Sequence, residues 1–321
     1  MSLPRIAVLM AVYEPNMVWL AEQLDSLNGQ TYPNIFLYIR DDCSQSISDD
    51  DLLACVREHI TAFPYLISRN ERNLGSNGTF ELLTAEAEGD FFAYCDQDDV
   101  WLPDKLKLLT EDLRREDALL VCSDMYVTDG QGRQIADRIA KVRRHQVLKS
   151  GSGLAPGLLT HNFVTGCTML VRAECAKAAI PFCPYMVHDH YLALYCAAKG
   201  SIYADPRPLI RYRLHGGNQT GAMTGVTDKN SYCRVRIEDS IRRFEWLREY
   251  FPGDPALSAQ IERCLLWLRA RLRYWREKRG AAELWHLRDC GRQVTLFELF
   301  AARMNEKMFL FFIWLYRKNI I

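Results

Sequence analysis

The chain has 321 residues, of which 49% are hydrophobic and 25% are charged, proportions that exclude a chain disordered throughout. Forty Lys and Arg residues balance forty Asp and Glu residues, which excludes a nucleic-acid-binding protein held by an overall positive charge. The length predicts one large domain with a companion, or two of modest size.

The first half of the chain alternates short apolar runs with helical patterns. An apolar run over 6–12 predicts a strand, Leu20, Leu24 and Leu27 then recur at helical spacing, and a second apolar run covers 35–39. Further strands are expected at 65–68, 91–95, 119–123 and 168–171, and helices at 52–62, 79–87, from about 103 and at 192–198. Short buried strands that alternate with helices are typical of a mostly parallel sheet covered on both faces.

The pattern of the sequence changes near residue 226. Segment 131–159 is polar and glycine-dotted, and it predicts a loop with a short helix. Beyond Gly225, proline and glycine become rare, and apolar residues such as Leu257, Ile261 and Leu268 recur at helical spacing. We therefore expect an α/β domain over 1–225 and a helical domain over 226–321.

The cysteines and the apolar runs bear on the location of the protein. Eleven cysteines are spread along the chain with at least eight residues from one to the next, so no Cys-x-x-Cys motif is present. Buried, reduced thiols are the simpler interpretation. The apolar run at 6–13 is short for a secretion signal, and no stretch reaches the roughly 20 apolar residues of a membrane-spanning helix. We expect a cytoplasmic protein.

Three carboxylates follow the strand predicted at 91–95. In an extended segment Asp96 and Asp98 point to the same side, where their like charges need a cation or a proton. Oxygen ligands of this kind suit Mg²⁺ or Mn²⁺ together with substrate phosphates. The alternative is an acidic loop in which Asp99 caps the next helix. Because a cap needs only one acid, we favour a metal site.

Asp41 and Asp42 end the second predicted strand. At the carboxyl edge of an open α/β sheet, such acids can accept hydrogen bonds from a nucleotide base or a ribose. Segment 48–51 is also acidic, so the pair equally fits a cluster that caps the helix beginning near residue 51. The sequence leaves these two interpretations open.

Two later segments carry further candidate groups. Asp189 stands between two histidines ahead of a helical run, where it fits either a general base or a helix cap. Arg211, Arg213 and His215 precede a flexible diglycine in the segment 216–219. Arginine binds phosphate and histidine can ligate a metal, whereas a solvated strand edge with a turn is the alternative for this segment.

In their order and spacing, these motifs resemble those of family 2 glycosyltransferases over about residues 5–220. The matching parts are 6–13, 23–27, 30–32, Asp41-Asp42-x-Ser44, Asn70, Asn73-Leu74-Gly75 and Asp96-Gln97-Asp98-Asp99-Val100-Trp101. The last of these is similar to the rhamnosyltransferase-like branch. The chain departs from the family at Glu14-Pro15, where Asn-Gly is usual. It also lacks the Gln-x-x-Arg-Trp motif of processive synthases, which argues against a polymerase.

The resemblance implies the GT-A fold, a Rossmann-like mixed and mostly parallel sheet flanked by helices. It also implies an inverting, metal-dependent glycosyltransferase of surface polysaccharide synthesis that uses Mg²⁺ or Mn²⁺. The donor is expected to be dTDP-rhamnose, with a UDP-hexose or UDP-N-acetylhexosamine as the alternative, and the acceptor a glycan or lipid-linked glycan hydroxyl. The family's pattern makes Asp189 the catalytic base and Asp96, Asp98 and His215 the metal site.

The same resemblance implies the remaining site residues. The donor would contact Ala11, Tyr13, Asp41, Asp42, Asn70, Asn73, Gly75, Asp96, Gln97, Arg211 and Arg213. The acceptor side would include Trp101, Thr165, Gly166, Cys167 and His188.

Two other functions fit parts of the pattern. A hydrophobic strand followed by Asp96-x-Asp98 also fits the nucleophile motif of haloacid-dehalogenase-type phosphatases, although that motif usually follows the first strand of its domain. The second alternative is a protein that binds a sugar nucleotide without transferring the sugar. The presence of Asp96, Asp98 and Asp189 argues against it.

The C-terminal region combines basic and aromatic residues. Six Lys or Arg residues lie within 269–279, and 308–316 is an apolar run followed by Arg317-Lys318. Such a helix favours the surface of an anionic membrane, here the inner face of the plasma membrane. The alternative is that its apolar face packs on the catalytic domain or on a second subunit. We place membrane association slightly ahead of a homodimer.

Overall fold

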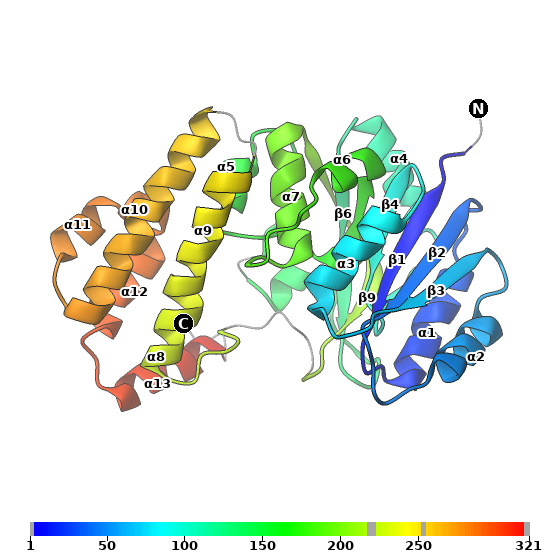
Figure 1. The fold of residues 1–321 in the computed structure, drawn as a ribbon, viewed down its shortest axis with the longest axis horizontal. Coiled ribbons are helices and arrows are strands. Elements are labelled where there is room, and N and C mark those ends of the chain that lie inside the picture. The colour runs from blue at the N-terminus through cyan, green and yellow to red at the C-terminus, as the bar shows by residue number, and fades with distance from the viewer. Residues whose placement is uncertain (1–2, 145, 217–222, 252–254, 318–321) are drawn as a thin grey trace. The chain divides into compact units, whose positions relative to one another are not determined.

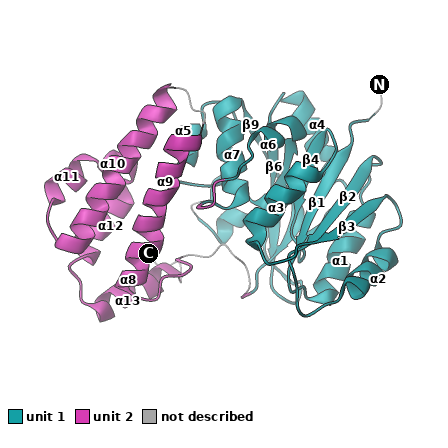
Figure 2. Ribbon diagram, viewed as in Figure 1, with its two compact units in different colours: residues 1–182, 186–215 teal, residues 183–185, 216–321 magenta. Residues whose placement is uncertain are grey.

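The computed structural model describes residues 3–144, 146–216, 223–251 and 255–317. The chain divides into two compact units, which Figure 2 colours separately. One unit contains residues 1–182 and 186–215, and the other contains residues 183–185 and 216–321. The domain boundary expected near residue 226 remains a prediction. Of the segment 216–219, with its predicted flexible diglycine, only Gly216 belongs to the described residues, and Lys318 also lies outside them.

A single mixed sheet forms the centre of the first unit (Figure 1). Its strands are β1 (Ile6–Val12), β2 (Ile35–Asp41), β3 (Tyr65–Arg69), β4 (Phe91–Cys95), β5 (Val100–Trp101), β6 (Leu120–Thr128), β7 (Gln134–Ala136), β8 (Met169–Arg172) and β9 (Ile202–Arg213). Within the described residues the order is β3-β2-β1-β4-β8-β6-β9-β5, with β7 paired to β6. This mixed sheet confirms the predicted fold class. The strands β1 to β4 pair in parallel, whereas β8 runs antiparallel to both β4 and β6.

Helices connect and cover these strands. They are α1 (Met17–Asn28), α2 (Asp49–His59), α3 (Gly75–Glu86), α4 (Lys105–Arg115), α5 (Ala155–Leu158), α6 (Ala173–Ala178) and α7 (His188–Lys199). The β1-α1-β2 and β3-α3-β4 crossovers run in opposite directions along the sheet. Since such connections are right-handed, α1 and α3 cover opposite faces. The apolar side chains of β1 and β4 are therefore buried on both sides.

The connection between β2 and α2 resolves one open interpretation. Ser48 is the N-cap of α2, and its hydroxyl accepts a hydrogen bond from the Asp51 N–H while the Asp51 carboxylate bonds back to Ser48. This capping box satisfies the first turn of the helix without any contribution from Asp41 or Asp42. The helix-cap interpretation therefore belongs to Ser48 and Asp51, and the two earlier acids are left for another role.

The topology also places the candidate site. From β1 the chain goes to β2 on one side, whereas β4 pairs with β1 on the other. The parallel strands end at the same edge, so Tyr13, Asp42 and Asp96 follow three neighbouring strands there. In open α/β sheets, ligands bind at such a switch point.

Strand β9 rules out the alternative interpretation of its sequence. That alternative was a solvated strand edge with a turn, whereas β9 pairs with β6 on one side and with β5 on the other. Tyr212 and Arg213 are buried there. The polar residues of this strand, such as Asp205 and Arg207, made its pairing on both sides hard to predict. They are accommodated inside the fold because Arg207 bonds to Asp205 and to Asp112.

The second unit is built from helices around its own core. They are α8 (Lys229–Tyr232), α9 (Asp239–Tyr250), α10 (Pro255–Glu277), α11 (Ala281–His286), α12 (Arg292–Ala301) and α13 (Glu306–Arg317). The predicted apolar stripe of α10 is buried, including Leu257, Ile261 and Leu268. Arg271 and Glu298 form a buried ion pair of 2.5 Å between α10 and α12. Among the described residues, none of the helices combines the length and the apolar composition needed to cross a bilayer.

Candidate active site

The acidic segment after β4 meets the end of β9. Asp98 and His215 lie side by side, with 2.6 Å between Oδ2 and Nε2. The imidazole of His215 also packs against the ring of Trp19, at a centroid distance of 5.0 Å. Burial, followed by the negative charges of Asp98 and Asp189, raises the pKa of Asp96 to about 7. Of the three residues predicted to hold a metal, the structure thus places Asp98 in contact with His215 and Asp96 close enough to Asp98 for their charges to interact.

This donor set fits a hard divalent cation. Asp96, Asp99 and Cys167 offer ligand atoms that all lie within 4.8 Å of one another. Burial raises the pKa of the Cys167 thiol well above its usual value, so this sulfur stays protonated and is a poor ligand for Mg²⁺ or Mn²⁺. The predicted set, the carboxylates of Asp96 and Asp98 with the imidazole of His215, offers the oxygen and nitrogen ligands that such a cation accepts, and it remains a prediction. A cation there would replace the proton that burial and repulsion favour on Asp96.

Arg213 holds the acidic segment in place. Its backbone N–H donates to Asp99 Oδ1 at 2.9 Å, and its Nε donates to the Asp98 carbonyl at 2.8 Å. The guanidinium also pairs with Glu22 and lies over the ring of Trp19. Arg213 is buried, and its hydrogen bonds to Asp98 and Asp99 fix the position of the acidic segment.

Arg211 occupies a different environment on the same strand. Its side chain is exposed, and it lines a groove of about 600 Å³ together with Glu22, Asp25 and Gln131. Arg213 lines the same groove, so the two arginines that the sequence assigned to the donor differ in burial but adjoin one space.

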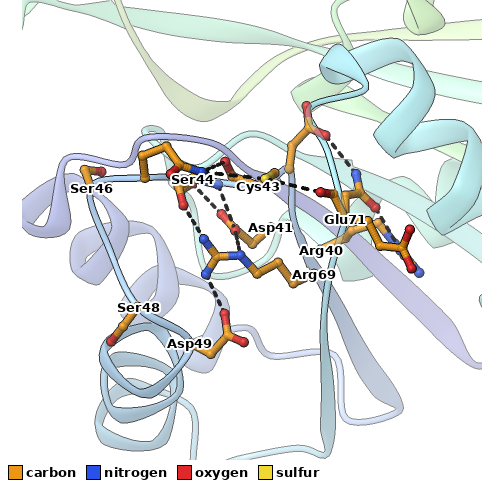
Figure 3. Close-up of polar contacts among 12 residues, drawn as sticks. Arg40, Asp41, Cys43, Ser44, Ser46, Ser48, Asp49, Arg69 and Glu71 are labelled. Atoms are coloured by element: carbon orange, nitrogen blue, oxygen red, sulfur yellow. Dashed lines mark hydrogen bonds and ion pairs between the residues drawn. The ribbon is translucent and has the colours of Figure 1, made fainter.

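Asp41, the last residue of β2, binds a neighbouring loop (Figure 3). The Asp41 carboxylate accepts hydrogen bonds from Ser44 N at 3.0 Å and pairs with Arg69 at 3.2 Å. In Figure 3, Arg69 lies between Asp41 and Asp49. The Ser44 carbonyl accepts a further hydrogen bond from the same guanidinium. This cluster fixes the loop that leaves the edge of the sheet.

Asp42 organises the loop after β3. Its carboxylate accepts from Asn70 Nδ2 at 2.8 Å, from Leu74 N at 2.7 Å and from Gly75 N at 2.8 Å. Asn73 also accepts a bond from Gly75 N at 3.0 Å. Gly75 has a φ of +73°, a conformation that glycine adopts at little cost. The residues of this loop that match the family's motifs are thus held together through the buried carboxylate of Asp42.

The ends of β1 and β4 are joined by a side-chain amide. Tyr13 N donates to Gln97 Oε1 at 2.8 Å, and Gln97 Nε2 donates to the Tyr13 carbonyl at 2.9 Å. Ala11 lies in β1, where it pairs with Arg40 of β2. At the departure from the family pattern, the Glu14 carboxylate accepts from Gln45 N at 2.6 Å and from Ser46 N at 3.0 Å. Glu14 therefore ties this edge to the 44–46 loop.

Asp189 lies in the first turn of α7 and faces a turn before β8. Its Oδ2 accepts a hydrogen bond from Gly166 N at 2.9 Å, and its Oδ1 accepts from Asn162 Nδ2 at 3.1 Å. The N-cap residue of α7 is Val187, so Asp189 is not the cap that the sequence left as an alternative. Burial raises the pKa of Asp189 to about 6. The carboxylate is oriented, partly desolvated and electrostatically coupled to Asp96.

The turn beside Asp189 is tightly packed. A Cβ atom on Gly166 would lie 2.7 Å from Nε2 of His188, so only glycine fits there. The His188 ring stacks on Phe80 at 4.1 Å, and burial lowers the pKa of His188 to about 3. The ring is therefore neutral and acts as packing. Thr165 is buried and accepts a hydrogen bond from Gln146 Nε2 at 2.9 Å.

Lys105 is a site residue that the sequence analysis missed. The ammonium is fully buried, donates to the Cys167 carbonyl at 2.5 Å, and lies 3.0 Å from the ring centroid of Trp101. Burial lowers its pKa to about 7, against the opposing effect of nearby acids such as Asp99. Trp101 is buried beneath this ammonium, so it supports the site from below. The sequence did carry a signal for this burial. Lys105 lies one residue before the apolar stripe of α4 and four residues before Leu109, so Lys105 and Leu109 share a face of the helix.

Asn162 was also missed. It lies in a loop four residues before Gly166, and nothing in the local pattern pairs it with Asp189. Its amide also bonds to the Val164 carbonyl at 2.8 Å, which fixes the orientation of the group.

Comparisons with known proteins identify the family and the fold. The sequence model of the family described as Glycosyl transferase family 2 matches residues 8–177. The dTDP-rhamnosyl transferase RfbG of Shigella flexneri is 26% identical over 250 residues, which cover 72% of this chain and 78% of that relative.

Two solved structures resemble the chain along nearly its whole length. TarS 1–349 of S. aureus, in complex with UDP-GlcNAc, has a TM-score of 0.60 at 15% identity and covers 98% of this chain and 92% of its own. The mannosyltransferase PcManGT of Pyrobaculum calidifontis, in complex with GDP-Man and Mn²⁺, has a TM-score of 0.57 at 13% identity, with coverages of 99% and 81%. These likenesses confirm the predicted GT-A fold.

Proposed function

Because the chain belongs to glycosyl transferase family 2, we propose that it transfers a sugar from a nucleoside diphosphate to a hydroxyl of a glycan or lipid-linked glycan, with inversion and with a divalent metal. The observation that carries this proposal is the contact of Asp98 with His215 beside Asp96, whose pKa the negative charges of Asp98 and Asp189 help to raise. A phosphatase loses its support, because Asp96 follows the fourth strand in a chain with this family match.

The residues suited to hold Mg²⁺ or Mn²⁺ are Asp96, Asp98 and His215. When bound, such a cation supplies stabilisation of the negative charge on a departing diphosphate. Arg213 keeps the Asp98 backbone and the Asp99 side chain in register through two hydrogen bonds. Asp42 and Gln97 hold the loops on the donor side, so this wall is preorganised before a nucleotide arrives.

Asp189 is the proposed base. The acceptor hydroxyl forms a bond to the anomeric carbon, the bond from that carbon to the diphosphate oxygen breaks, and the hydroxyl proton passes to the Asp189 carboxylate. The hydrogen bonds from Gly166 and Asn162 orient the carboxylate, and its raised pKa brings it nearer to the range of an effective base. A single base opposite the leaving group gives inversion.

We propose dTDP-rhamnose as the donor and a surface polysaccharide as the product. Support comes from the curated relative named as a dTDP-rhamnosyl transferase and from the Asp-Gln-Asp-Asp-Val-Trp sequence at 96–101. A UDP-hexose or UDP-N-acetylhexosamine is the second candidate, which the fold likeness to TarS bound to UDP-GlcNAc favours.

Thermal shift tests the proposal and separates the two donors. Ligands that bind the folded state raise the melting temperature by mass action. We expect dTDP or dTDP-rhamnose to raise it only when Mn²⁺ or Mg²⁺ is present, and UDP-GlcNAc to raise it less. A larger shift with UDP species would select the second donor. A folded protein that responds to no nucleotide would overturn the proposal and favour neither candidate.

A further inference from the structure

Helix α13 exposes an apolar face. Phe309 and Ile313 point into the core of the second unit, whereas Phe311 and Trp314 are 56% and 50% exposed. Leu310 is also exposed, and no charged residue occurs between Lys307 and Arg317. A helix that is apolar on its outer as well as its inner side needs a cover other than water.

The orientation of this helix is fixed by its inner side. The ring of Phe309 packs against Tyr232 at 5.5 Å and against Trp275 at 5.9 Å. On the outer side, Phe311 and Trp314 stack on each other at 6.1 Å. The two aromatic rings therefore form one continuous surface that is exposed among residues 223–251 and 255–317.

Charge indicates what covers this surface. Residues 223–251 and 255–317 contain 18 Lys and Arg against 11 Asp and Glu, a net charge of +7 in a chain whose overall charge is zero. Positive groups lie near the beginning of α13. Figure 1 shows α13 at the same end of the unit as α8. Arg303 donates to the Lys278 carbonyl at 3.3 Å, and Lys229 donates to the Ala302 carbonyl at 2.9 Å.

A polar hollow lies beside the same end of α13. This space of about 760 Å³ is lined by the basic residues Lys229, Arg234, Arg276 and Lys278 and by the acidic residues Asp228, Glu238 and Glu306. The positive charges of Lys229 and Arg303 contribute to a lowered pKa of Lys278, after the larger effect of burial. Cations thus adjoin the beginning of the apolar face.

We propose that α13 lies in the surface of an anionic membrane, with Phe311 and Trp314 at the boundary of the acyl chains and Lys307 and Arg303 among the lipid phosphates. Aromatic and basic residues favour this zone. A second copy of the chain fits less well, because two units of charge +7 repel each other when their faces meet. The inference is independent of the proposed donor and reaction.

Vesicle flotation tests this proposal with the full chain. We expect the protein to float with vesicles of phosphatidylcholine and phosphatidylglycerol, to stay at the bottom with phosphatidylcholine alone, and to be released by high salt. Phe311→Gln with Trp314→Gln weakens binding at least about tenfold, because two apolar side chains no longer insert. Lys307→Gln weakens it about fivefold. Tyr250→Gln, an exposed aromatic at the end of α9, is the matched control and leaves binding unchanged.

The remaining outcomes overturn the proposal. Circular dichroism and melting curves establish that each variant is folded. If the folded double variant floats like the wild type, or if the wild type does not float with anionic vesicles, α13 does not bind the membrane. If sedimentation instead shows a wild-type dimer that the double variant converts to a monomer, the face is an interface between copies.

Discussion

The catalytic role assigned to Asp189 depends on its immediate surroundings. Two hydrogen bonds fix the carboxylate, while burial opposes its charge and raises its pKa from 3.8 to about 6. Since the base must be deprotonated, we expect the transfer rate to fall as the pH drops through about 6 and to level off above it. A pH profile of single-turnover transfer measures this dependence. A rate that stays constant from about pH 5 to about pH 8 would contradict the role of Asp189 as the base.

A second prediction at the residue scale concerns Gly166. Gly166→Ala places a Cβ 2.7 Å from Nε2 of His188, and the ring cannot retreat because it stacks on Phe80. We expect a loss of about 1–3 kcal/mol in the free energy of unfolding and a lower kcat. Gly157→Ala is the matched control, because no atom lies within 4 Å of its added Cβ. Denaturant unfolding of both variants decides the point, and equal stability would show that the turn tolerates a side chain.

Among the elements, those with a continuous sequence signal were predictable. The apolar runs of β1, β2 and β4 gave strands with nearly correct bounds, and the acids that follow them lie at one edge as expected. Strand β9 escaped because its polar residues are paired with partners distant in sequence, such as Arg207 with Asp112. The contact of Asp189 with Gly166 joins α7 to another loop, and no local pattern encodes such a contact. Lys105 escaped because a lysine in a helix usually faces water.

The loop after β3 yields a prediction at the element scale. Asp42→Asn puts an amide N–H₂ group where three donors now converge, so at least one of them loses its acceptor. We expect a loss of about 1–3 kcal/mol in stability and weaker donor binding, read from melting curves and from the KM for the donor. Asp49→Asn is the control, since this acid is exposed and its ion pair with Arg69 contributes about 1 kcal/mol or less. If the two variants behave alike, Asp42 does not organise the loop.

For the whole molecule, the site carries a cost in stability. The pKa of Asp189 in the folded protein lies about 2 units above its ordinary value, so the ionised carboxylate disfavours folding by up to about 3 kcal/mol near pH 7. This penalty is absent below the ordinary pKa, grows as the pH rises from 3.8 to about 6, and levels off above that value. Replacing the acid by an amide removes the penalty, although the single amide oxygen can no longer accept from both Gly166 and Asn162 in the same geometry. Such a substitution should not lower the melting temperature substantially at neutral pH.

The most direct test of the proposed chemistry is therefore Asp189→Asn, assayed for sugar transfer and for nucleotide binding in parallel. We predict that transfer falls by at least about a hundredfold, while the metal-dependent thermal shift with the nucleoside diphosphate is retained. Loss of both signals in a folded variant would make Asp189 a residue of the donor site. Near-normal transfer by Asp189→Asn would contradict the account, because the reaction would then not depend on the Asp189 carboxylate as a base.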